Sequence, residues 1–175
     1  MHPRTAELLG YLDDADGALR AAYDAVPAER RAERPAPDRW SPAEIVHHLA
    51  IVERRVTQRI ASLVEQARAL PPEPDASPVL PTLTARRLVD RTRRIVAGEA
   101  SHPHDTEAAR AWADLDDARR ALKDIVVGAD GLALGRVSAP HPALGEISGY
   151  EWIAFAGAHE ARHAAQIREI VSGDS

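Results

Sequence analysis

Two histidines near the C-terminal end of the chain, His159 and His163, have the spacing of metal ligands on a helix. Residues four apart on a helix lie on one face on successive turns, so both imidazoles would rise from that face about a metal's width apart. Two histidines alone would hold a divalent ion weakly, and the site therefore needs a third ligand from elsewhere in the chain. Because the sequence contains no cysteine, that ligand must bind through nitrogen or oxygen.

The best candidate for the third ligand is His48, which lies in another predicted helix. The stretch Ser41-Pro42-Ala43-Glu44 has the pattern of a capping box and predicts a helix over 41–69. The apolar stripe of this helix consists of Ile45, Leu49, Val52, Val56, Ile60 and Leu63. At about 100° per residue, His48 lies on the flank of the stripe and His47 on the opposite, solvent side. Of these two histidines, only His48 can face inward.

A second capping box, Ser148-Gly149-Tyr150-Glu151, predicts the start of the helix that carries His159 and His163. Both histidines fall at the centre of an apolar stripe that also contains Trp152, Phe155, Ala156, Ile167 and Ile170. A buried ring nitrogen without a partner costs about 1 to 3 kcal/mol, and a metal would satisfy one nitrogen of each ring. Hydrogen bonds from Gln166, Glu44 or Tyr150 are the alternative. An inward-facing His48 on a facing helix favours the metal.

The segment His159-Glu160-Ala161-Arg162-His163 also spells the His-Glu-x-x-His signature of zinc proteases. Such enzymes usually take their third ligand from a separate downstream helix, whereas only twelve residues follow His163 and none of them is a histidine. A motif this short also arises readily by chance in a helix rich in alanine and glutamate. The sequence therefore argues against a protease.

The rest of the chain predicts an all-α protein with a single domain over 1–175. Aromatic residues make up only 4% of the sequence, and alanine, leucine, arginine and glutamate dominate it. Apolar periodicity predicts further long helices over 3–25 and from Asp105 or Thr106, as the N-cap, to Gly128. A shorter basic helix is predicted over 84–97, and an extended piece over 132–137 within the connection 131–148. The main amphipathic helices favour a four-helix bundle, which builds metal sites in its core.

The bulk properties argue against some partners and locations. The chain has 22 basic and 27 acidic residues, and a net charge of -5 is unfavourable for a nucleic-acid-binding surface. Residues 1–10 are polar, and no apolar run reaches the length of about 18 residues that a membrane span requires. We therefore expect a cytoplasmic protein without a membrane or nucleic-acid partner. The sequence assigns no role to His47, His102, His104 or His141.

Two segments carry a resemblance to a known family: residues 40–49 (WSPAEIVHHL) and residues 159–167 (HEARHAAQI). They resemble the DinB/YfiT-like superfamily of suspected metalloenzymes, in which a tryptophan and a capped helix start precede a histidine before leucine. In that family a His-x-x-x-His-x-x-Gln-Ile run closes the last helix. The resemblance implies an up-down-down-up four-helix bundle, often a homodimer, in which three histidines hold zinc or nickel. Here these would be His48, His159 and His163, the same three that the periodicity selects.

The resemblance also implies kinship with thiol-dependent S-transferases and maleylpyruvate isomerases that use mycothiol, bacillithiol or glutathione. A divalent ion on three neutral imidazoles keeps open positions and can activate a thiol or a water molecule at neutral pH. We expect transfer of a low-molecular-weight thiol to an electrophilic small molecule, and the thiol must come from a cosubstrate because the chain has no cysteine. The alternatives are a metal-dependent hydrolase and a non-catalytic bundle that binds metal or a small ligand. In a hydrolase, Glu160 is the candidate catalytic base, unless it pairs with Arg162 or another charge.

Overall fold

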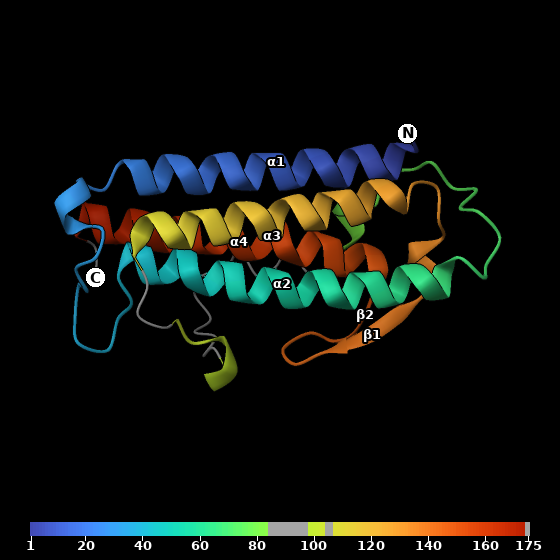
Figure 1. The fold of residues 1–175 in the computed structure, drawn as a ribbon. Helices are drawn as coiled ribbons and strands as arrows, with labels where there is room; N and C mark the ends of the chain where they lie inside the picture. The colour runs from blue at the N-terminus through green and yellow to red at the C-terminus, as the bar shows by residue number, and fades with distance from the viewer. Residues whose placement is uncertain (84–97, 104–106, 174–175) are drawn as a thin grey trace.

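The computed structural model describes residues 1–83, 98–103 and 107–173. Four long helices run along one another: α1 (Pro3–Asp24), α2 (Pro42–Ala67), α3 (Ala108–Gly128) and α4 (Gly149–Ser172). Figure 1 shows that α2 and α3 point the same way, whereas α1 and α4 point the opposite way. The bundle is therefore up-down-down-up, with α2 packed mainly on α3 and α1 mainly on α4. The predicted all-α four-helix bundle is confirmed.

The two predicted capping boxes begin the helices that carry the histidines. At α2, the Glu44 backbone N–H donates to Ser41 Oγ over 3.2 Å, and the Ser41 N–H donates to Glu44 Oε2 over 2.8 Å. At α4, Ser148 and Glu151 exchange the same pair of bonds over 3.3 Å and 3.0 Å. These bonds satisfy N–H groups that have no partner inside the helix, so the start of each helix is set by its own sequence.

Some predictions outside the main helices need correction or stay open. The predicted basic helix over 84–97 lies outside the described residues, as do the predicted caps Asp105 and Thr106. The N-cap of α3 is Glu107, so the prediction of an earlier cap was wrong. The predicted extended piece was also misplaced, because part of that stretch forms a 3-10 turn, Leu134–Arg136, and the extended segments follow it.

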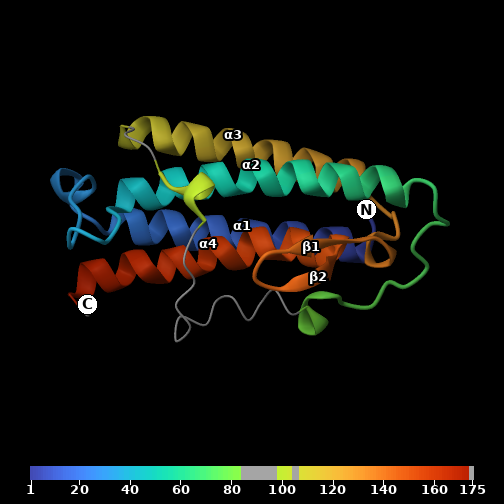
Figure 2. The ribbon, with the colours of Figure 1, turned by 90° about the horizontal axis from the view of Figure 1, so that it is seen from below.

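The extended segments form an antiparallel hairpin of β1 (Ser138–His141) and β2 (Gly145–Ser148) just before α4. Its prolines argue against a strand when only the sequence is considered. A proline is nevertheless tolerated in a two-stranded ribbon, where each strand has a free edge. Gly145 has a φ of 75°, in the left-handed region that suits glycine at the end of the turn. The Trp152 indole N–H donates to the Ala139 carbonyl over 3.3 Å and ties the hairpin to α4. Figure 2 shows the hairpin lying along α4.

The apolar core consists of two clusters, which lie at opposite ends of the bundle. Each helix passes from one cluster to the other at a charged side chain, and these side chains are Asp16, Glu53, Arg119 and Glu160 from α1 to α4 in order. Glu53, Arg119 and Glu160 are buried. A charged layer therefore separates the two halves of the core. At Gly157 a Cβ would lie 2.7 Å from the Tyr11 ring, so glycine allows the close packing of α1 on α4.

Candidate metal centre

Three imidazoles from two helices converge beside the charged layer: His48 from α2, and His159 and His163 from α4. One ring nitrogen of each lies within 4.8 Å of the others. The Nε2 atom of His159 lies 3.3 Å from His48 Nε2 and 3.1 Å from His163 Nε2. Nitrogen ligands about 2.0 to 2.1 Å from a tetrahedral zinc ion lie about 3.3 to 3.4 Å from one another. The spacing of the Nε2 atoms is therefore close to that of ligands sharing one ion.

Two of these rings are oriented by hydrogen bonds at their other nitrogen. His48 Nδ1 lies 2.7 Å from the carbonyl oxygen of Ser101, and His163 Nδ1 lies 2.8 Å from Oε1 of Gln166. Since both partners are acceptors, each Nδ1 carries the proton, and each Nε2 presents its lone pair to the cluster. Metal-bound histidines use their second N–H in this way, which fixes the tautomer and the ring orientation. The outer hydrogen bonds that metal-bound histidines use are thus present at His48 and His163.

The protons available in the cluster do not suffice for hydrogen bonds between all the rings. His159 Nε2 carries at most one proton when its ring is neutral, so it can donate to His48 or to His163 but not to both. Burial lowers the pKa of His159 well below its usual value, and the neighbouring imidazoles of His163 and His48 lower it further. Burial also lowers the pKa of His48. A cation between the Nε2 atoms would satisfy all three lone pairs, and the residues present therefore fit a metal ion.

Aromatic rings enclose the cluster on two sides. Trp40 lies against His48 with the ring centroids 4.7 Å apart, and Phe155 is stacked on His159 at 5.4 Å and an interplanar angle of 15°. His48 is only 3% exposed and His163 only 8%. The apolar surroundings limit the competition of water for a bound ion. The predicted alternative partners Glu44 and Tyr150 are used elsewhere, whereas Gln166 does bind His163.

An arginine that the sequence did not single out holds the segment behind His48. Arg55 lies two helical turns after His48 on α2 and donates to Ser101 Oγ over 3.1 Å and to the Ala100 carbonyl over 2.6 Å. These bonds fix the short 3-10 turn Glu99–Ser101, whose last carbonyl accepts from His48. Arg55 is thus a positioning residue for His48. A backbone acceptor has no sequence signature, so the pattern of residue types could not reveal this contact.

We expect Arg55→Ala to weaken metal binding by about 10-fold, because loss of an outer hydrogen-bonding group costs about 10-fold to 100-fold in affinity. The measurement is the Kd for zinc and nickel by competition with a chromogenic chelator. Arg54→Ala is the matched control, since Arg54 is the adjacent residue and its side chain binds Asp114 on α3. Equal affinities of the two variants would contradict a role of Arg55 in holding Ser101.

Glu160, the predicted catalytic base, leaves α4 in another direction and forms a buried ion pair. Its Oε2 lies 2.6 Å from Arg119 Nη2, and the same guanidinium nitrogen donates to Glu53 Oε2 over 2.9 Å. Burial raises the pKa of Glu53 to about 8 and that of Glu160 to about 6, although Arg119 lowers both. Arg119 therefore pairs with both of these buried carboxyl groups. The structure gives Glu160 a charge partner in the core, and its catalytic role stays a prediction.

Of the remaining histidines, His2 is the N-cap residue of α1, and the others lie near this centre or outside the described residues. His102 is exposed and packs edge-on against Trp40, with the ring centroids 5.8 Å apart. His47 is half-buried on α2, and His104 lies outside the described residues. His141, at the end of β1, packs on Phe155 with the ring centroids 4.5 Å apart. His102 and His141 therefore each contact an aromatic ring that itself lies against a histidine of the cluster.

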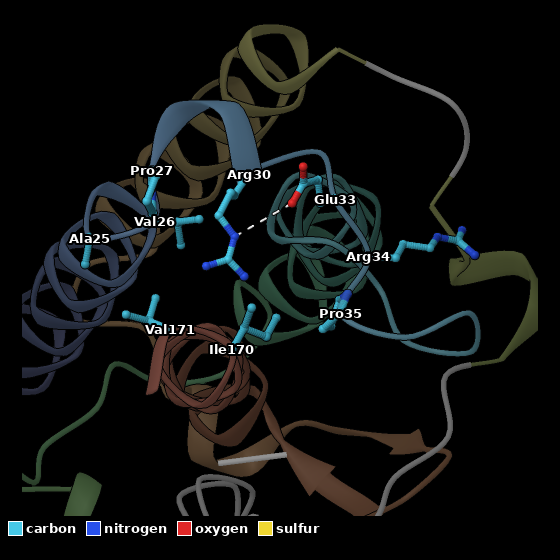
Figure 3. A pocket seen from close by; sticks show the side chains of 9 residues that line it. All are labelled: Ala25, Val26, Pro27, Arg30, Glu33, Arg34, Pro35, Ile170 and Val171. Atoms are coloured by element: carbon cyan, nitrogen blue, oxygen red, sulfur yellow. Dashed lines mark ion pairs between the residues drawn. The ribbon is translucent and has the colours of Figure 1, made fainter. Parts of the chain in front are cut away.

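A cavity of about 360 Å³ lies at one end of the bundle, away from the histidine cluster (Figure 3). Its walls come from the connection between α1 and α2 and from Ile170 and Val171 near the end of α4. Its charged side chains are already paired: Arg30 lies 3.7 Å from Glu33, and Arg34 donates to Glu44. None of His48, His159 and His163 lines it, so the cavity is separate from the histidine cluster.

Comparisons with known proteins agree with this fold. The sequence model of the DinB superfamily matches residues 7–167. A relative from Bacillus subtilis (strain 168), named Uncharacterized protein YuaE, is 27% identical over 144 residues, which are 81% of this chain and 83% of that protein. The crystal structure of TT2238, described as a four-helix bundle protein, aligns with a TM-score of 0.60 and 22% identity over 94% of this chain and 98% of that chain. At this identity the structural likeness shows the fold alone.

No helix in the described ranges is long and apolar enough to cross a membrane.

Proposed function

The chain belongs to the DinB superfamily, and from that premise we propose that it binds one divalent metal ion, zinc or nickel, through His48, His159 and His163. We further propose that it transfers a low-molecular-weight thiol to an electrophilic small molecule. The observation that carries the first part is the approach of three Nε2 atoms from two helices, with the outer nitrogens of His48 and His163 bound to acceptors. Hydrogen bonds between neutral imidazoles cannot satisfy this arrangement, whereas a cation can.

A divalent ion held by three neutral imidazoles lowers the pKa of a thiol or a water molecule that binds to it. The neighbouring residues orient the histidine ligands and cover their rings. Ser101 and Gln166 keep the lone pairs of His48 and His163 directed at one point. Trp40 and Phe155 cover the rings with apolar surface, which favours an organic thiol and an electrophile over bulk water. The thiol comes from a cosubstrate, because the chain has no cysteine.

Thiol transfer is favoured over hydrolysis because the base considered for a hydrolase is engaged elsewhere. Glu160 was the candidate for that base, and its carboxylate is paired with Arg119 at 2.6 Å. A thiol transferase needs no such group when the thiol is already ionised at the working pH. The position of Glu160 therefore supports the transferase as the leading function and weakens the hydrolase.

The test uses untagged protein loaded with zinc or nickel, a panel of low-molecular-weight thiols and chlorodinitrobenzene as the electrophile. In the reaction a carbon–sulfur bond forms, the carbon–chlorine bond breaks, chloride leaves and the thiol proton passes to water. We expect thiol-dependent formation of the thioether, followed by mass spectrometry, and its loss after chelation and in His48→Ala, His159→Ala and His163→Ala alike. Equal consumption of electrophile with and without thiol would indicate a hydrolase. A metal-loaded protein without turnover on any thiol would contradict the transferase.

A further inference from the structure

His141 lies next to the metal centre without belonging to the cluster. Its ring packs on Phe155 at 4.5 Å and on Trp152 at 5.1 Å between centroids, and Phe155 is in turn stacked on His159. Trp152, Phe155 and His159 follow one another at spacings of three and four along one face of α4. The hairpin that carries His141 lies along this helix (Figure 2). The aromatic pair is buried and therefore lies between a histidine of the cluster and His141.

The Nδ1 atom of His141 accepts hydrogen bonds, whereas the Nδ1 atoms of His48 and His163 donate them. Its Nδ1 accepts from the backbone N–H groups of Ala143 and Leu144, over 3.1 Å and 3.2 Å. Nδ1 therefore carries no proton, and in the neutral ring the proton lies on Nε2. Burial, which lowers the pKa of His141, favours this neutral form. His48 and His163 present a lone pair at Nε2, whereas His141 presents an N–H donor.

The turn of the hairpin holds this donor in place. Leu144 also donates to the His141 carbonyl over 3.3 Å, so the ring is bound by the same short turn that closes β1 on β2. His141 is half-buried, and its Nε2–H has no hydrogen-bond acceptor among the residues that the structure describes. A donor fixed by two backbone bonds loses little conformational freedom when it binds a ligand. These are the properties of a ligand-binding group.

We propose that His141 binds the electrophilic substrate, with its Nε2–H donating to a carbonyl or carboxylate oxygen. The proposal rests on the proposed function, because it places the electrophile beside the histidine cluster. It also names a substrate class: electrophiles that carry a carbonyl or carboxylate oxygen. His141 acts in binding, so its loss raises the KM for the electrophile more than it lowers kcat.

The test uses benzoate as the probe, since its carboxylate supplies the oxygen acceptor. We expect ¹⁵N NMR of the zinc-loaded protein to show the proton of His141 on Nε2 and to show that resonance shifting as benzoate is added. His141→Phe keeps an aromatic ring on the hairpin but removes the donor, and its Kd for benzoate should rise about 10-fold. His141→Gln keeps an N–H donor and should stay within about threefold of the wild type. Metal content, measured in parallel, should be the same in all three proteins.

The outcomes separate this proposal from the proposed function. A proton on Nδ1, no binding of benzoate by the wild-type protein, or equal affinity in His141→Phe would overturn the role of His141. If thiol transfer is observed and His141→Phe changes neither the Kd nor the KM, this inference alone fails. If no metal binds and no thiol transfer occurs, the proposed function fails, whatever the affinity for benzoate. The position of the His141 proton and the binding of benzoate are measured on the wild-type protein, so the proposal stays testable if a variant fails to fold.

Discussion

Replacing His163 by alanine should lower the metal content of the purified protein from about one zinc or nickel ion per chain to almost none. The remaining pair, His48 and His159, would hold an ion through two nitrogens on different helices, and no carboxylate joins them in the cluster of described residues. Loss of an outer hydrogen-bonding group already costs about 10-fold to 100-fold in affinity, so loss of a direct ligand should cost more than about 100-fold. Elemental mass spectrometry of untagged protein measures the content, and chelator competition measures the Kd.

His47→Ala is the matched control for this experiment. His47 adjoins His48 on α2 and is absent from the cluster, so its removal should leave the metal content unchanged. Gln166→Leu should give an intermediate result, because it removes the acceptor of His163 Nδ1 and leaves all three ligands in place. If neither the wild type nor His163→Ala contains or takes up metal, and chelator leaves folding unchanged, the cluster is a structural part of the core.

Arg119→Ala should lower the free energy of unfolding by about 3 to 5 kcal/mol, which is the cost of removing one partner of a buried ion pair. Arg119 is 6% exposed and lies between Glu53 and Glu160, which are 4% and 1% exposed. Without the guanidinium, two buried carboxyl groups lose their cation, and Asp16 of α1 adds a further negative charge that already acts on both. Urea unfolding at neutral pH, followed by circular dichroism, measures the change.

Arg120→Ala is the control, because Arg120 is the next residue of α3 and its ion pair with Asp117 is largely exposed. An exposed ion pair contributes little to stability, so the free energy of unfolding of this variant should lie within about 0.5 kcal/mol of the wild-type value. A loss in Arg119→Ala no larger than in Arg120→Ala would show that the charged layer contributes nothing to stability. A triple variant with Glu53, Arg119 and Glu160 replaced by apolar residues should recover much of the loss, since no buried charge is then left unpaired. The layer would in that case serve to align the helices.

The sequence by itself determined the helices and the faces that they bury. Capping boxes at Ser41 and Ser148 and a period near 3.6 are local properties, written in residues within a few turns of one another. They were sufficient to select His48, His159 and His163 and to exclude His47 from the inward face, and the structure brings the three selected residues together. The family resemblance added the order of the helices, which periodicity cannot supply.

Only the tertiary structure decided which groups surround those histidines. The Ser101 carbonyl behind His48 is 53 residues away in the chain, and the Glu53–Arg119 bond spans 66 residues. Such contacts depend on how the helices are aligned and on where connecting segments return to the bundle, and no local pattern records this. Glu160 illustrates the limit, since no local pattern records that its charge partner is Arg119. The proton position on His141 likewise depends on backbone N–H groups in a hairpin turn, whose geometry is set by folding rather than by residue type.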